Sequence, residues 1–231
     1  MELGKLLTGT QAKVVFMDCD GVIYDTNRLK CDAFRYALDG YPTEAVEAIV
    51  AYHRRTGGVS RYLKIERFFA ELHPVADPRA AAQTALQRFA DFCERGYERM
   101  RPRPEALAFA ERFGGPERVH VVSGSDEAEL RRVFEAADLA HRFAGVHGSP
   151  VGKKTHLTRL LAAHKATAAE ALFVGDGWGD WDAATAFGIP FVYLAEMSEW
   201  DDGPSTIAAA GSALVTQADT WEDLLAAVRA S

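Results

Sequence analysis

The sequence of 231 residues predicts an α/β protein in which helices flank a parallel sheet, with an all-helical segment inserted after the first strand. Two observations support this prediction. Short, nearly continuous apolar runs recur along the chain, as expected for strands that are buried on both faces of a parallel sheet. Helical spacing lies between these runs, and it alone fills residues 27–100.

The first predicted strand covers residues 13–18 and runs directly into the sequence DCDGV. Residues 27–100, which follow, contain no convincing strand. This helical segment ends near residues 99–103, where Pro102 and Pro104 discourage a continuous helix. We therefore expect two domains: an α/β core formed by residues 1–26 and 101–231, and a helical domain formed by residues 27–100.

Four further apolar runs predict strands at residues 118–123, 171–176, 190–195 and, more weakly, 212–217. Helices are expected between them at residues 126–139, 154–166 and 180–188. The alternation of strand and helix predicts right-handed crossovers and a layered, Rossmann-like core.

Composition and charge exclude several classes of protein. The formal charge is −7 and no long basic run is present, which argues against nucleic acid as a partner. No apolar stretch is long enough to cross a membrane, and the N-terminus lacks the pattern of a secretory signal. Cys19, Cys31 and Cys93 are not spaced like the cysteines of a metal site and are most simply free thiols. We expect a cytoplasmic protein that acts on a small molecule.

Polar side chains follow several of the predicted strands at the edge where such sheets bind ligands. Asp18 and Asp20 close the first strand. The second ends in Ser123-Gly124-Ser125, and the sequence GDGWGDWD closes a later one. Two adjacent lysines stand at the start of the helix before that strand. The residues expected to meet in one crevice are Asp18, Asp20, Ser123, Lys153, Lys154, Asp176, Asp180 and Asp182.

Carboxylates gathered in one place repel each other unless a cation is bound among them. Carboxylate oxygens favour Mg²⁺, which commonly binds through a few carboxylates together with a substrate phosphate. A nearby lysine, the Ser123 hydroxyl and the backbone N–H of Gly124 would supply donors for phosphate oxygens. The residues therefore predict a magnesium-dependent site for a phosphoryl group.

These motifs closely resemble those of the haloacid dehalogenase superfamily, the hydrolases that use an aspartate nucleophile. The resemblance rests on DCDGV, on Ser123, on the lysine of GSPVGKK and on GDGWGD, which occur in the family's order and cover about two thirds of the chain. It implies that residues 27–100 form a helical cap of the first type. It also places this sequence near the phosphoglycolate phosphatases and β-phosphoglucomutases.

By this resemblance, Asp18 is the nucleophile that forms an aspartyl-phosphate, and Asp20 is the general acid and base. Ser123 and Gly124 would bind the phosphoryl oxygens. Lys153 matches the family's lysine, with Lys154 as the alternative. Asp18, Asp176 and the backbone carbonyl of Asp20 would hold Mg²⁺. The metal site also includes Asp180, either as a direct ligand or as a carboxylate that orients one.

The presence of Asp20 favours phosphoryl transfer over dehalogenation or phosphonate cleavage. GGVSR at residues 57–61 resembles a cap loop of the β-phosphoglucomutase group, and we expect Arg61 to bind an anionic part of the substrate. Lys30 stands where that group has a histidine, and Lys154 stands where it has a proline. A phosphatase of small phosphomonoesters is therefore favoured, while a phosphomutase and a non-catalytic phosphate-binding protein stay open.

Overall fold

The computed structural model describes residue 7 and residues 12–229. Six parallel strands form one sheet in the order β3-β2-β1-β4-β5-β6. The strands are β1 (Val14–Met17), β2 (Val119–Asp126), β3 (Gly145–Ser149), β4 (Ala171–Gly175), β5 (Phe191–Leu194) and β6 (Val215–Ala218). The parallel α/β architecture predicted from the sequence is confirmed.

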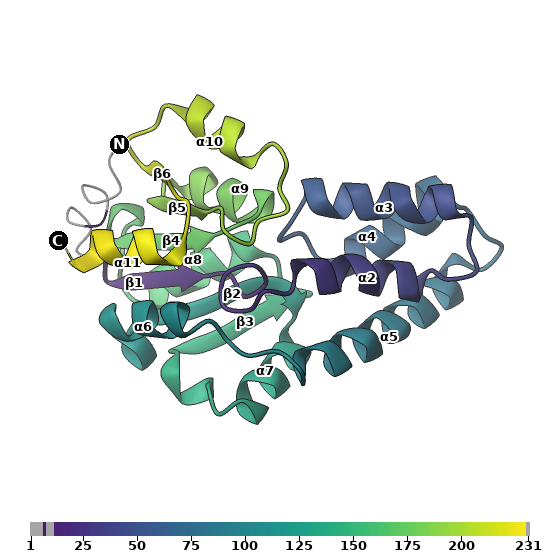
Figure 1. The fold of residues 1–231 in the computed structure, drawn as a ribbon, viewed down its shortest axis with the longest axis horizontal. Helices are drawn as coiled ribbons and strands as arrows, with labels where there is room; N and C mark the ends of the chain where they lie inside the picture. The colour runs from purple at the N-terminus through teal and green to yellow at the C-terminus, as the bar shows by residue number, and fades with distance from the viewer. Residues whose placement is uncertain (1–6, 8–11, 230–231) are drawn as a thin grey trace.

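Helices cover both faces of the sheet (Figure 1). Along β1, Val15 and Met17 belong to one apolar cluster, whereas Val14 and Phe16 belong to the other, as the alternation of side chains along a strand requires. The first cluster is packed by α6 (Pro104–Arg112), α7 (Glu127–Ala136) and α11 (Trp221–Arg229), and the second by α8 (Lys153–Ala163), α9 (Trp178–Phe187) and α10 (Gly203–Ala210).

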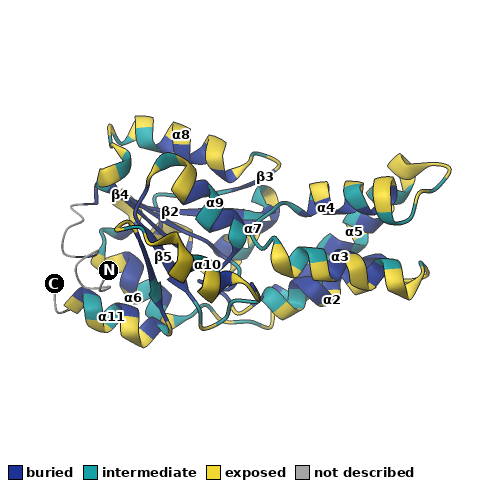
Figure 2. Cartoon of the chain, turned by 90° about the horizontal axis from the view of Figure 1, so that it is seen from above, coloured by how far each residue is buried: buried dark blue, intermediate teal, exposed yellow. Residues whose placement is uncertain are grey.

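Four helices and one π-helical turn between β1 and α6 lie at the end of the sheet where the strands terminate (Figure 1). They are α2 (Asn27–Ala37), α3 (Thr43–Arg55), α4 (Arg61–Arg67), the turn at Phe68–Leu72 and α5 (Pro78–Tyr97). Their buried faces pack on one another, while their outward faces are exposed (Figure 2). Phe34 and Phe89 of this helical segment belong to the same apolar cluster as Val15 and Met17 of the sheet.

The sequence did not predict β3, which contains two glycines and a histidine in five residues. It lies at the edge of the sheet, and its first four residues alternate between half-buried and buried, so a continuous apolar run is not required. Helices α6, α10 and α11 were also not predicted. Among the described residues, no helix is both long enough and apolar enough to span a membrane.

Candidate functional site

The carboxyl ends of β1, β2 and β4 lie side by side, because Met17 pairs with Val121 on one side and with Val174 on the other. Asp18 directly follows β1, and its N–H donates to the Val174 carbonyl at 3.0 Å. The sheet register therefore brings together the three segments that carry Asp18, Ser123 and Asp176, although these residues lie far apart in the sequence.

The chain turns sharply after Asp18, so that Asp20 also reaches the site. Gly21 has a φ of +78°, a conformation that a residue with a side chain rarely adopts. A Cβ at this position would also collide with the side chains of Asp176 and Asn27. Glycine is thus required at position 21 both by the backbone conformation and by the close approach of the Asp176 carboxylate.

Asp20 is held by several donors. The hydroxyls of Thr26, Tyr97 and Ser125 donate to its carboxylate at 2.5, 2.5 and 2.6 Å. The ammonium of Lys30 lies 3.5 Å from it. Burial alone would raise the pKa of this carboxyl, but Lys30 and the three hydroxyl donors hold the pKa below its ordinary value.

Three carboxylates, from Asp18, Asp176 and Asp180, form a buried cluster in which ligand oxygens lie within 4.8 Å of one another. Burial and the charge of Asp180 raise the pKa of Asp18 to about 7. Burial and the charges of Asp18 and Asp180 raise the pKa of Asp176 well above its usual range. The Asn27 amide donates to Asp176 at 2.6 Å. The cluster therefore carries more negative charge than its protein partners balance.

Lys153 is the cation that contacts this cluster. Its Nζ lies 2.8 Å from Asp18 Oδ1 and 2.5 Å from Asp180 Oδ1. Asp180 is fully buried, and its other oxygen accepts the Gly177 N–H at 3.0 Å, which fixes it at the start of α9. Lys154 instead forms an exposed pair with Asp182 at 2.9 Å. Of the two lysines, only Lys153 reaches the predicted nucleophile.

Ser123 is buried at the end of β2, where its Oγ accepts the N–H of Ser125 at 3.1 Å. Gly124 packs against the backbone of Gly58, so closely that a Cβ there would collide with the Gly58 carbonyl. Asp126 caps α7 by accepting the Glu129 N–H at 2.9 Å. The serine is therefore not used as the helix cap, and both it and Gly124 line the pocket.

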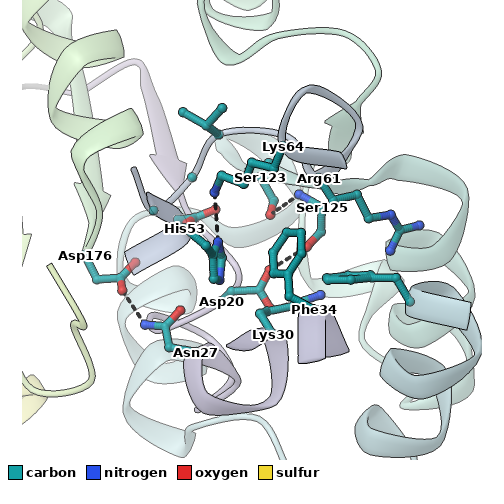
Figure 3. A pocket seen from close by; sticks show the side chains of 16 residues that line it. Asp20, Asn27, Lys30, Phe34, His53, Arg61, Lys64, Ser123, Ser125 and Asp176 are labelled. Carbon is teal, nitrogen blue, oxygen red and sulfur yellow. Dashed lines mark hydrogen bonds and ion pairs between the residues drawn. The ribbon is translucent and has the colours of Figure 1, made fainter. Parts of the chain in front are cut away.

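The helical segment closes over this site through the loop before α4. The Gly57 carbonyl accepts the Gly179 N–H at 2.7 Å, so the loop touches the start of α9 directly. The pocket between the helical segment and the sheet is small, about 50 Å³, and is lined by residues of both (Figure 3). The sheet side contributes Asp18, Asp20, Ser123, Gly124, Ser125 and Asp176.

Three cationic side chains of the helical segment line the same pocket: Lys30, Arg61 and Lys64. Arg61 forms an ion pair of 2.7 Å with Glu129, both side chains being nearly inaccessible to solvent. Its Nε is buried without an acceptor among the described residues, whereas the Lys30 ammonium forms ion pairs with Asp20 at 3.5 Å and Glu129 at 3.8 Å. Arg61 thus lines the pocket, but most of its charge is balanced by Glu129.

Lys64 is fully buried and was not singled out from the sequence. Its Nζ lies 2.8 Å from His53 Nδ1 and donates to the Thr56 carbonyl at 3.0 Å (Figure 3). Burial lowers the pKa of its ammonium to about 7. No carboxylate pairs with it within residues 12–229. Its position three residues after Arg61, on the same helix face, is the only sequence signal that could have identified it.

Comparisons with known proteins agree with this geometry. The family model for haloacid dehalogenase-like hydrolases matches residues 12–188. A phosphoglycolate phosphatase from Mesorhizobium japonicum is 29% identical over 188 residues, which cover 78% of this chain and 81% of that protein.

Two solved structures also share the fold. A predicted phosphoglycolate phosphatase from Haemophilus somnus superposes with a TM-score of 0.71 at 18% identity and covers 94% of this chain and 98% of its own. A hydrolase from Pseudomonas syringae has a TM-score of 0.71 at 20% identity, covering 92% and 96% of the two chains.

Proposed function

Because the chain belongs to the haloacid dehalogenase-like hydrolases and is an enzyme of the phosphatase type, we propose that it hydrolyses a small organic phosphomonoester through an aspartyl-phosphate on Asp18. One observation carries this proposal. Asp18 and Asp20 follow β1 into a pocket that Ser123 and Asp176 also line, with Lys153 in contact with Asp18.

In the proposed reaction, an Asp18 oxygen attacks phosphorus, and the bond between phosphorus and the ester oxygen breaks. Lys153 lowers the pKa of Asp18 against the larger effect of burial and so favours the ionised form that can attack. The Ser123 hydroxyl and the Gly124 N–H bind phosphoryl oxygens. Water then attacks the acyl-phosphate and releases inorganic phosphate and the free Asp18 carboxylate.

Asp20 moves the protons in both steps. It gives its proton to the departing alkoxide and then takes one from the attacking water. In the substrate-free protein its hydrogen-bond donors favour the ionised form. A phosphoryl dianion placed beside it raises the pKa of the carboxyl, and this supplies the protonated form when substrate binds.

The residues fit a bound Mg²⁺. Two of the three buried carboxylates pair with Lys153, and the oxygens of all three are the ligand type that this ion prefers. Asp18, Asp176 and the Asp20 carbonyl would hold the ion. Asp180 would orient Lys153, and it caps the start of α9 by accepting the Gly177 N–H. When bound, Mg²⁺ would neutralise the carboxylates and polarise the phosphoryl group.

The helical segment, residues 27–100, is proposed to act as the cap that selects the substrate. Its closed position leaves little space, which favours a short substrate. Lys30, Arg61 and Lys64 face that space, and the buried Arg61 Nε, which has no acceptor among the described residues, favours a second anionic group on the substrate. A short phosphorylated carboxylic acid satisfies both conditions, and the similarity to a phosphoglycolate phosphatase supports the same class.

The test is a turnover screen with purified protein and Mg²⁺ against phosphorylated metabolites of increasing length, with and without a second anionic group. We expect release of inorganic phosphate, fastest from two- or three-carbon phosphorylated acids. Isomerisation of a sugar phosphate without phosphate release would instead identify a mutase. Tight binding of phosphate with no turnover of any substrate, aryl phosphates included, would identify a binding protein.

A further inference from the structure

A second cluster of side chains that can bind a metal ion lies outside the pocket described above. Glu127, His147 and His156 each place one ligand atom within 4.8 Å of the other two. They come from α7, β3 and α8. None of them lines the active-site pocket, and none contacts the aspartate cluster within the described residues. Two further histidines, His120 and His164, are linked to this group.

We propose that Glu127, His147 and His156 form a binding site for a divalent transition metal ion, for which Zn²⁺ is the natural probe. Two imidazoles and one carboxylate are a ligand set that suits Zn²⁺ and its neighbours rather than Mg²⁺ or Ca²⁺. Three protein ligands leave one position of a tetrahedral site for water, which fits the partial exposure of Glu127 and His147. This site does not depend on the proposed phosphatase reaction.

The hydrogen bonds around His147 prepare it as a ligand. Its Nε2 lies 3.0 Å from His120 Nδ1, and His120 Nε2 lies 2.8 Å from His164 Nε2. Each contact between two ring nitrogens needs one N–H and one lone pair, so the chain of imidazoles has two possible proton arrangements. When His147 donates through Nε2, its Nδ1 keeps a free lone pair. A metal ion at His147 selects this arrangement, and His120 then orients the ring.

His156 is oriented in a similar way. It is buried, and its Nε2 lies 3.0 Å from the Gly148 carbonyl. Because a carbonyl oxygen only accepts, Nε2 carries the proton and Nδ1 carries the lone pair. Its ring lies 5.3 Å from the ring of His147, centre to centre. Both histidines therefore have one nitrogen occupied by a protein partner and the other available to a metal ion.

Glu127 completes the set from the start of α7. One of its oxygens accepts the Gly148 N–H at 3.1 Å, and the other pairs with Arg131 at 2.8 Å. These contacts hold the carboxylate in place while lone pairs on both oxygens are left over. The ligand atoms lie within 4.8 Å of one another and must draw together by at most about 1.5 Å to reach bonds of roughly 2.0–2.2 Å, which small side-chain rotations can supply.

The test is a calorimetric titration of Zn²⁺ into chelator-treated full-length protein, with Mg²⁺ in excess to compete at the aspartate cluster. We expect one Zn²⁺ per chain. His147→Ala and His156→Ala should each weaken binding by at least about 100-fold, since loss of a supporting partner alone commonly costs 10- to 100-fold. His120→Ala should fall in that smaller range. His141→Ala, which changes an exposed histidine, is the matched control and should bind as the unmodified protein does.

A second measurement needs no substitution. In ¹⁵N spectra of the histidine rings, Zn²⁺ should shift the Nδ1 resonances of His147 and His156 and leave those of His141 unchanged. No binding in excess Mg²⁺, equal weakening in the His141→Ala control, or unchanged His147 and His156 resonances would each overturn the proposal.

Discussion

Replacing Lys64 with methionine should make the protein more stable and less able to use an anionic substrate. The Lys64 ammonium is fully buried in the pocket wall and has no carboxylate partner within the described residues. A buried cation of this kind destabilises the empty protein, whereas an anionic substrate would pair with it. Methionine keeps the length and apolar character of the side chain but not its charge.

The magnitude follows from the pKa of Lys64. Its fall from 10.5 to about 7 corresponds, at about 1.4 kcal/mol per pKa unit, to roughly 5 kcal/mol of destabilisation at low pH and about 4 kcal/mol at pH 7. Methionine also removes the hydrogen bonds to His53 and to the Thr56 carbonyl, which costs about 1–3 kcal/mol. The variant should gain about 1–3 kcal/mol, equivalent to about 3–10 °C in melting temperature.

The sign of the pH dependence gives a sharper test. The folded-state pKa of Lys64 lies below the unfolded value, so the unfolded chain binds more protons between pH 7 and pH 10.5. Stability of the unmodified protein therefore rises with pH across this range. The advantage of the Lys64→Met variant should be largest at or below pH 7 and disappear towards pH 10.5. Melting curves at several pH values measure this directly.

The activity of the Lys64→Met variant towards an anionic substrate should fall, although its stability rises. Loss of one charge-assisted contact, worth about 1.5–3 kcal/mol, should lower kcat/KM for a phosphorylated acid by roughly ten- to a hundredfold. An aryl phosphate without a second anionic group should be little affected. In the unmodified protein, the ratio of the two kcat/KM values should fall as pH rises through 7, because the Lys64 ammonium loses its proton there. Taking the ratio cancels the titration of Asp18, which affects both substrates.

Lys154→Met is the matched control, because Lys154 is exposed and its ammonium pairs with the surface carboxylate of Asp182. It should change neither the melting temperature by more than about 1 °C nor the substrate ratio. A Lys64→Met protein that is less stable at pH 7 and that keeps the substrate ratio of the unmodified enzyme would refute the reasoning. Lys64 would then support the helical segment and not bind the substrate.

Three further outcomes test the proposed reaction. Asp18→Asn should remove nearly all turnover without lowering the melting temperature, and a folded variant with more than about a tenth of the activity would contradict covalent catalysis. Asp20→Asn should slow substrates with poor leaving groups most and aryl phosphates least, so an equal loss across leaving groups would argue against acid–base catalysis. A chelator should abolish activity and Mg²⁺ should restore it, while Asp176→Ala should sharply raise the Mg²⁺ requirement and Asp182→Ala should not; full activity in excess chelator would exclude the metal.

The sheet and the membership of the family could be predicted because both depend on local signals. Apolar runs bounded by polar residues locate five of the six strands, and DCDGV with GDGWGD identifies the family. The edge strand Gly145–Ser149 gives no such signal, since burial on one side does not require continuous apolar side chains. The structure places the predicted pair Asp18 and Asp20 beside Lys153, Ser123 and Asp176, although their chemical roles stay predictions.

The contacts of the helical segment could not be predicted, because they join residues that are distant in the sequence. Tyr97 is 77 positions from Asp20 and yet donates to its carboxylate. Glu129, which lies in the core, pairs with Arg61 and largely neutralises its guanidinium. The sequence gives no sign of this ion pair. Lys64 has no such partner in the part of the chain that the structure describes and thus becomes the stronger candidate for binding an anion. Which cation in a pocket can bind an anionic substrate therefore depends on which of the cations the fold has already paired with a carboxylate. That pairing is a property of the tertiary structure.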